Sequence, residues 1–233
     1  STLQPKGVAL THKNIVTAIT EFSALDIFDD CKNALSLLPF NFSGERKLCY
    51  SYLLRGICIC VPGKADTIPA SLQFFNPDIT GLVPYLMQNL LDGAGAGGSS
   101  NFKGLRIICG GAQVSQYLIS RFEQLGSNVF EVYGLTETAS LLSYNTFSAR
   151  RTGTAGVLAK NVMVKLSDQS EIWVKGDVLM KGYWVKNNVA ESGLNREGWF
   201  ETGDIGHLDE TGFLHITGRI GNVFKNTKGE FIY

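Results

Sequence analysis

The sequence Leu105-Arg-Ile-Ile-Cys109, followed by Ser115–Leu125 and then by Val129-Phe-Glu-Val-Tyr133, decides the fold class. The first and last segments are short apolar runs of the kind that form buried strands, and the segment between them is typical of a helix. A strand, a helix and a second strand in this order predict a crossover unit with parallel strands.

The same alternation continues toward the N-terminus. Buried strands are predicted at residues 34–40, 56–62 and 79–83, with helices at about 12–25, 43–55 and 85–91. Thr11 and Ser43 are residue types that cap helix starts. These elements predict an α/β fold of mostly parallel sheets flanked by helices over residues 1–160. Short strands separated by turns, at 162–166, 171–175 and 212–217, then predict a smaller β-rich subdomain over residues 161–220.

The composition excludes several classes of protein. The chain has 233 residues, of which 44% are hydrophobic and 18% are charged, so a packed core is expected rather than disorder. Lys+Arg and Asp+Glu number 21 each, so no net positive charge attracts a nucleic acid. Apolar runs such as Gly56–Pro62 are far shorter than the roughly 20 residues of a transmembrane segment. We therefore expect a soluble, cytoplasmic protein.

Three features that could suggest a metal or nucleotide site are better explained otherwise. The five cysteines form no C-x-x-C pair and are expected to be reduced core residues, and the three histidines lack the spacing of metal ligands. Gly93-x-Gly95-x-x-Gly98 has the spacing of a dinucleotide-binding motif but follows a predicted helix instead of a strand. The segment Asp92–Ser100 around it is predicted to be a mobile surface loop.

Four groups of residues could bind a nucleotide, and each has a simpler alternative. Ser1, Thr2 and Lys6 could surround a phosphate chain, or form an ordinary exposed turn. The segment Tyr133–Thr138 follows a predicted strand. Its Tyr133 could offer a ring face to a base, and Gly134 would permit a close approach of the backbone. Thr136 could offer a hydroxyl, and Glu137 could supply an oxygen ligand for Mg²⁺. Alternatively, the segment could be a solvated turn.

The other two groups lie further along the chain. Asp204, in Thr202-Gly-Asp204, could accept ribose hydroxyls or cap its own backbone. Arg219 could add a fork of donors or lie on the surface.

The order of the motifs is more specific than any one of them. Pro5-Lys-Gly-Val8, Tyr133–Thr138, Gly182-Tyr-Trp184, Gly198-Trp-Phe-Glu-Thr-Gly-Asp204 and Gly218-Arg219 together resemble the adenylate-forming superfamily. This superfamily includes acyl-CoA synthetases, firefly luciferase and the adenylation domains of peptide synthetases. The resemblance extends over the whole chain.

The resemblance implies a reaction and a nucleotide site. In this superfamily a carboxylic acid attacks the α-phosphate of ATP, and the resulting acyl-adenylate passes its acyl group to the thiol of CoA or of a carrier protein's phosphopantetheine. It assigns the triphosphate to Ser1, Thr2 and Lys6, and the α-phosphate to Thr136. Glu137 is assigned to Mg²⁺, the base to Tyr133 and Gly134, and the ribose to Asp204 and Arg219. Gly110, Gly111 and Ala112 are placed beside the adenine and the acyl pocket.

The acyl side is less fully specified. By the resemblance, Asn41 and Phe42 occupy the segment that carries a gating aromatic or histidine, and Phe40, Asn41, Val83, Gly111 and Leu135 are candidate pocket walls, with core packing as the alternative. Asn41 has no charge to pair with the ammonium group of an α-amino acid, so the sequence favours a fatty or aryl acid.

The sequence departs from the family pattern at two positions. Leu3 stands where the family usually has glycine, and Gly221 replaces a charged hinge residue. By the resemblance, residues 221–233 are the hinge and the start of a C-terminal domain. That domain would carry the lysine that bridges the acyl carboxylate and the α-phosphate, and Lys225 matches a different position.

Three functions follow from these observations. The leading one is an AMP-forming acid–CoA ligase. The others are an adenylation domain that loads a carrier protein, and a nucleotide-binding module without turnover.

Overall fold

The computed structural model describes residues 6–63, 67–93, 102–185, 188–190, 193–220, 224–225 and 231–232. Its largest element is a seven-stranded sheet in the order β3-β2-β4-β5-β6-β7-β8. The first five strands are parallel, and β7 and β8 are antiparallel to their neighbours. The predicted α/β class is confirmed. The strands are β2 (Asn33–Leu35), β3 (Cys58–Cys60), β4 (Ile79–Leu82), β5 (Arg106–Cys109), β6 (Asn128–Tyr133), β7 (Ser143–Tyr144) and β8 (Val157–Leu158).

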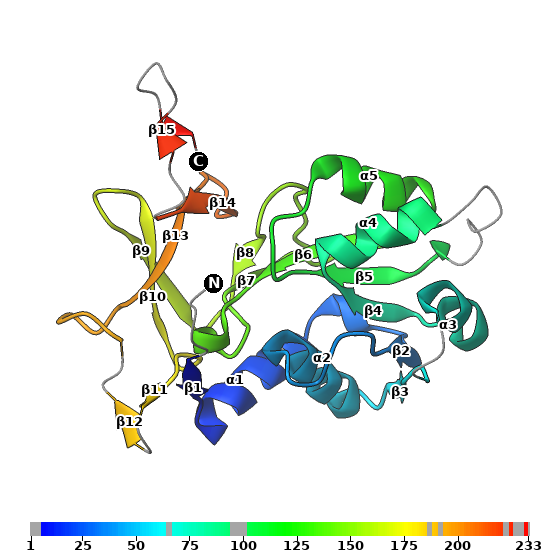
Figure 1. Cartoon of the computed structure of the whole chain (residues 1–233), viewed down its shortest axis with the longest axis horizontal. Helices are drawn as coiled ribbons and strands as arrows, with labels where there is room; N and C mark the ends of the chain where they lie inside the picture. Colours follow the sequence, from blue (N-terminus) through cyan, green and yellow to red (C-terminus); the bar gives the residue numbers. More distant parts are fainter. Residues whose placement is uncertain are drawn as a thin grey trace.

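Helices cover both faces of this sheet, because alternate strand residues point to opposite sides. Figure 1 shows α1 and α2 on one side and α4 and α5 on the other. Ile108 packs in the core beneath α1 and α2, whereas its neighbours Ile107 and Cys109 pack beneath α3, α4 and α5. The helices are α1 (His12–Ser23), α2 (Ser43–Leu54), α3 (Ile68–Phe75), α4 (Pro84–Gly93) and α5 (Gln116–Gln124).

A second, antiparallel sheet has the order β14-β13-β10-β9. Its strands are β9 (Val162–Leu166), β10 (Glu171–Gly176), β13 (Phe200–Leu208) and β14 (Leu214–Arg219). A three-stranded sheet of β1 (Gly7–Ala9), β11 (Gly182–Val185) and β12 (Asn188–Ala190) joins the start of the chain to this region, and β15 (Phe224–Lys225) pairs with β16 (Phe231–Ile232). A strand from the predicted first part therefore pairs with one from the second part.

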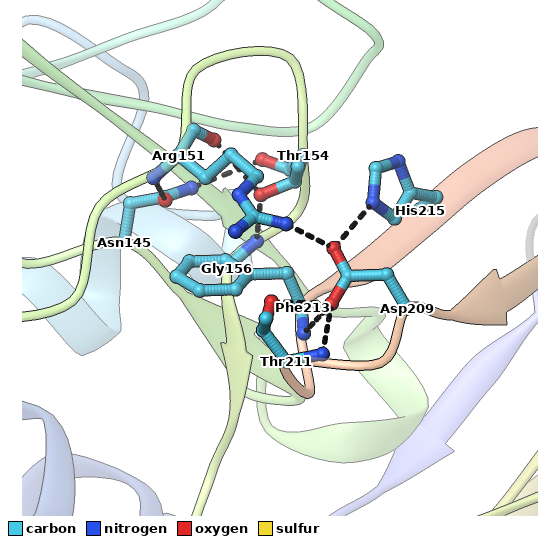
Figure 2. Close-up of polar contacts among 8 residues, drawn as sticks. All are labelled: Asn145, Arg151, Thr154, Gly156, Asp209, Thr211, Phe213 and His215. Carbon is cyan, nitrogen blue, oxygen red and sulfur yellow. Dashed lines mark hydrogen bonds and ion pairs between the residues drawn. The ribbon is translucent and has the colours of Figure 1, made fainter.

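A polar network connects the two large sheets. Figure 2 shows Arg151, from the loop between β7 and β8, donating to Asp209 in the β13–β14 turn at 2.5 Å, while the ring of His215 lies 3.0 Å from the same carboxylate oxygen. The other oxygen of Asp209 accepts the backbone N–H groups of Thr211 and Phe213. The hydrogen bonds from the Thr211 hydroxyl, the His215 ring and the backbone N–H groups of Phe213 and Thr211 hold the pKa of Asp209 well below its usual range. The network fixes the β13–β14 hairpin against the parallel sheet.

Most predicted elements are confirmed, and the differences have physical causes. The strand predicted at 34–40 covers only Asn33–Leu35, and Pro39, which has no backbone N–H, lies in the loop that follows. The predicted cap Ser43 is instead the first residue of helix α2, and the N-cap position is occupied by Phe42, whose side chain has no acceptor for a capping bond. Strand β13 includes Thr202–Asp204, which the sequence had indicated as a turn: Asp204 pairs with Arg219 of β14, and glycine at position 203 permits a φ of +74° inside the strand.

Three further expectations have separate outcomes. Cys49 and Cys109 are buried, but Cys58 lies exposed on the edge strand β3. Most of the predicted loop at 92–100 lies outside the described residues, and α4 continues to Gly93. None of the helices in the described segments is long and apolar enough to cross a membrane.

Candidate active site

The site lies where parallel strands β5 and β6 end, and glycines allow its backbone segments to touch. A Cβ atom on Gly134 would lie 2.3 Å from the carbonyl carbon of Ser140, and one on Gly110 would lie 2.8 Å from a methyl of Val132. Gly111 has a φ of +83°, which favours glycine. Two cavities flank the Gly134-Leu135 segment and share Gly111, Val132, Gly134, Leu135 and Arg219 as walls.

The first cavity, of about 390 Å³, is called here the tyrosine cavity because Tyr133 lines it. The Tyr133 hydroxyl donates to Asp204 at 2.7 Å, and the Arg219 guanidinium lies 3.7 Å from the other carboxylate oxygen. Burial raises the pKa of Asp204, while the bond from Tyr133 and the charge of Arg219 oppose that rise. A ring face, a carboxylate and a cation thus meet in one concave space lined also by Ala112.

The antiparallel sheet positions two of these groups. Asp204 on β13 and Arg219 on β14 are direct cross-strand partners. Asp204 is buried, and its backbone N–H donates to the Thr202 hydroxyl. The parallel sheet supplies the ring of Tyr133, so the cavity exists only where the two sheets meet.

Glu131 also lines the tyrosine cavity. Its carboxylate accepts the backbone N–H of Gly153 at 2.7 Å. Burial raises its pKa to about 7, against the opposing effects of the Gly153 bond and of Arg150. The sequence offered no signal for this residue beyond its place two positions before Tyr133.

The second cavity, of about 290 Å³, is called the lysine cavity because Lys47 lines it, together with Val83, Leu135, Thr136 and Glu137. Glu137 lies in the short helix η3 (Thr136–Thr138) and accepts the hydroxyl of Tyr183 at 2.8 Å. The ammonium of Lys6 lies 5.3 Å from the centre of the Tyr183 ring. Lys6, Tyr183 and Glu137 therefore form one cluster at the edge of this cavity.

A ladder of polar contacts follows the wall of the lysine cavity. The hydroxyl oxygens of Thr136 and Ser43 lie 3.2 Å apart, and Ser140 donates to Ser43 at 2.7 Å. The ammonium of Lys47 donates to the Ser140 carbonyl at 2.7 Å. Burial alone lowers the pKa of Lys47 to about 7. Sequence reasoning missed Lys47, since a lysine within a helix gives no signal that it is buried.

The structure brings most of the predicted site residues together. Those that line one or both cavities are Gly110, Gly111, Ala112, Tyr133, Gly134, Thr136, Glu137, Asp204, Arg219, Val83 and Leu135. Tyr183, which contacts Glu137, lies in the Gly182-Tyr-Trp184 motif but received no role from the sequence.

Other predicted residues lie elsewhere. Phe40 packs edge-on against Tyr50 and lines a separate cavity of about 590 Å³, and Asn41 is exposed outside the lysine cavity. The start of α2 explains this placement, because it turns Phe42 toward the lysine cavity instead. Ser1, Thr2, Leu3 and Gly221 lie outside the described residues.

The donor set fits a magnesium ion held together with a phosphate chain. Within the described segments, no three His, Cys, Asp or Glu side chains gather to hold a metal by themselves. Mg²⁺ needs only one or two carboxylates when phosphates and waters complete its shell. Glu137 uses one oxygen for Tyr183, and no described residue bonds the other.

Comparison with known proteins identifies the family. A family model described as AMP-binding enzyme matches residues 1–184. The chain belongs to the AMP-binding enzyme family. An Arabidopsis thaliana protein named oxalate–CoA ligase is 30% identical over all of this chain and 48% of that protein. A Mycobacterium bovis protein named long-chain-fatty-acid–CoA ligase FadD15 is 34% identical over 53% of this chain and 20% of its own length.

Solved structures of AMP-binding enzymes share the fold. A variant of E. coli MenE with bound OSB-AMS superposes with a TM-score of 0.84 at 26% identity, covering all of this chain and 49% of that one. A Mycobacterium tuberculosis fatty acyl CoA synthetase superposes with a TM-score of 0.79 at 24% identity, over all of this chain and 49% of that one. The chain therefore spans about half the length of relatives that it matches throughout.

Proposed function

We propose that the protein activates a carboxylic acid as an acyl-adenylate with ATP and then transfers the acyl group to the thiol of CoA. The observation that carries this proposal is the shared wall between the two cavities. Tyr133, Asp204 and Arg219 meet on one side of Gly134, and Thr136 and Glu137 stand on the other. The names of the relatives, which are CoA ligases, support CoA as the acceptor.

The tyrosine cavity has the groups that adenosine needs. The ring of Tyr133 offers a face to the base. Asp204 can accept both ribose hydroxyls once its bond from Tyr133 rearranges, and Arg219 can donate to the ribose or the phosphates. Arg219 lines both cavities, so the phosphate chain would pass from one to the other beside it.

The reaction would take place at the shared wall, near Thr136. A carboxylate oxygen of the acid attacks the α-phosphorus of ATP, and the bond from that phosphorus to the bridging oxygen breaks, which releases pyrophosphate. The CoA thiol then attacks the acyl carbonyl carbon, loses its proton, and AMP leaves. Thr136 would donate to the α-phosphate, and Lys6 would add positive charge. The protein thus contributes mainly position and charge neutralisation.

Glu137 is the residue that would hold Mg²⁺. When bound, the ion neutralises charge on the phosphate oxygens. The Tyr183 hydroxyl orients the Glu137 carboxylate, and the short η3 helix fixes its backbone, whose carbonyl accepts the N–H of Met180 at 2.7 Å.

A fatty or aryl acid is the substrate class that we propose for the lysine cavity. Phe42, Leu48, Val83 and Leu135 give it apolar walls suited to methylene groups or a ring. We also propose a cytoplasmic location. We further propose that the chain divides into an α/β part at residues 1–160, a β-rich subdomain at residues 161–220 and a third segment at residues 221–233.

The test is magnesium-dependent ATP–pyrophosphate exchange by the protein expressed from its complete coding sequence, over a panel of fatty and aryl acids. We expect Glu137→Ala to lower exchange about 10²-fold or more while the melting temperature changes little. Glu210→Ala, in an exposed turn, is the matched control.

The outcomes separate the three functions. Exchange that is unchanged by Glu137→Ala would contradict the metal role. ATP binding without exchange for any acid would instead indicate a nucleotide-binding module. Product assays with CoA and with a phosphopantetheinyl carrier protein then identify the acceptor.

A further inference from the structure

Lys47 is a buried cation beside the proposed acyl site. It lies on α2, and 5% of its surface is exposed. Its side chain lines the lysine cavity and also borders a smaller cavity of about 150 Å³ between α1 and α2. Lysine is almost never buried to this extent without a partner.

The described residues provide no counter-charge for this ammonium. It forms one hydrogen bond, to the Ser140 carbonyl, and lies 3.8 Å from the centre of the Phe22 ring. No ion pair in the described part of the chain includes it. The walls of the smaller cavity hold no carboxylate.

Two acidic residues lie on the same helix or in the same cavity, and neither forms an ion pair with Lys47. Glu137 lines the same cavity but accepts the Tyr183 hydroxyl. Glu45 lies two positions earlier on α2, where one carboxyl oxygen accepts the Ser36 hydroxyl and the other is buried without a hydrogen-bond partner among the described residues, and burial raises its pKa. Residues two apart on a helix do not share a face.

An unpaired buried charge costs on the order of several kcal/mol, and an anion that pairs with it in the cavity would offset part of that cost. We infer that the acid is a dicarboxylic acid, whose second carboxylate pairs with Lys47 while its first reacts near Thr136. This inference rests on the proposed function and adds to it that the chain or ring of the acid carries a second carboxylate.

The geometry of the cavity suits such a substrate. Thr136, Ser43, Ser140 and Lys47 follow one wall in sequence, each in contact with the next. The reacting end and the ammonium are therefore separated by only a few hydrogen-bonded links. Leu48, Val83 and Leu135 line the space around that wall, so a short methylene chain or ring would have apolar contacts between its two charged ends.

The experiment compares matched acids in ATP–pyrophosphate exchange by the protein expressed from its complete coding sequence. Succinate, glutarate and adipate are paired with butyrate, valerate and hexanoate, and kcat/KM is measured for each. We expect a diacid-to-monoacid ratio above one. Lys47→Met should lower that ratio about 10²-fold, because the second carboxylate would then be buried without a partner. Lys47→Arg should restore part of it.

Controls separate specificity from folding. Lys103→Met, at an exposed lysine away from both cavities, should leave the ratio as in the wild type. Melting temperature and ATP affinity are measured for every variant. If neither Lys47 variant folds, the ratio of kcat/KM for diacids to that for monoacids in the wild type still tests the inference.

Two results would overturn the inference while leaving the proposed function intact: a wild-type preference for monoacids, or an equal loss for both acid classes in Lys47→Met. The equal loss would show that Lys47 only stabilises the contact between α2 and Ser140. Absence of exchange with these acids and with the fatty and aryl panel would overturn both proposals.

Discussion

The tyrosine cavity and the lysine cavity share five wall residues but differ in how their charges are balanced. In the tyrosine cavity, Asp204 already has Tyr133 and Arg219 as partners. In the lysine cavity, the Lys47 ammonium ends a ladder of hydroxyl and carbonyl contacts, and no ion pair among the described residues includes it, although the Glu137 carboxylate lines the same cavity. In the tyrosine cavity, Asp204 can exchange its present partners for neutral ribose hydroxyls, whereas in the lysine cavity the Lys47 ammonium has no ion-pair partner among the described residues.

The difference also reflects where each cavity gets its side chains. The tyrosine cavity depends on two sheets meeting, because Asp204 and Arg219 come from the antiparallel sheet. The lysine cavity is built mainly within the α/β part, from α2, β4 and the end of β6. Changes to the shared wall should therefore affect both cavities, and changes to Lys47 or Glu131 should affect one.

The largest effect is expected for Gly134→Ala. The added Cβ would lie 2.3 Å from the Ser140 carbonyl carbon, and this neighbour is backbone rather than a movable side chain. We expect a loss of more than about 3 kcal/mol in the free energy of unfolding, with loss of both ATP binding and acid activation. Chemical unfolding and calorimetry with ATP measure these two losses.

Gly104→Ala is the control for Gly134→Ala. Gly104 has open space around its Cβ direction and a φ of +80°, so its substitution should cost only about 1 kcal/mol. If Gly134→Ala costs no more than this control, the two cavities do not depend on a close-packed wall.

Much of the fold was predictable because its signals are local. The strand–helix alternation from Leu105 to Tyr133 indicated the parallel sheet, and Thr11 caps its helix as its residue type predicted, whereas Ser43 does not. Strand β13 was missed at Thr202–Asp204, because a glycine with positive φ inside a strand has the same local sequence as a turn. Helix α3 was also missed, although Thr67 caps it.

The candidate site was predictable only where a motif exists. Tyr133, Glu137, Asp204 and Arg219 were found because their sequence contexts resemble a family pattern, and the structure brings them together. The burial of Lys47 depends on α1 packing over α2, which no local pattern encodes. Asn41 lies outside the lysine cavity, and its position in a motif did not indicate that Phe42 is the side chain that turns inward at the start of α2.

A smaller effect is expected from the pH dependence of stability at Lys47. Its folded-state pKa is about 7, below the ordinary value of 10.5. Between these values the unfolded chain binds more protons than the folded one, so this residue makes stability rise with pH. Below pH 7 Lys47 is charged in both the folded and the unfolded state, so the full free-energy cost of burying its charge is present. We expect Lys47→Met to remove a slope worth on the order of a few kcal/mol across the whole window.

The measurement is the difference in unfolding free energy between wild type and Lys47→Met at pH 6, 7, 8 and 9. The variant's advantage should be greatest at pH 6 and shrink as pH rises, and Lys103→Met should show no such trend. A difference that stays constant with pH would mean that the lysine is not desolvated, which would remove the contrast between the two cavities.

The smallest effect is expected at Glu131, and its sign is opposite. Burial raises the pKa of Glu131 from 4.5 to about 7, so between these values the folded state binds more protons and stability falls as pH rises. Glu131→Gln keeps an oxygen that can accept the Gly153 N–H and removes the charge, so the variant should gain stability relative to wild type from pH 5 to 7.5. The gain should be smaller than the Lys47 effect, because the Gly153 bond and Arg150 already stabilise the carboxylate. Glu210→Gln, in an exposed turn, serves as the control. Opposite slopes for Lys47→Met and Glu131→Gln would show that the lysine cavity desolvates a positive charge and the tyrosine cavity a negative one. Parallel slopes would contradict this difference.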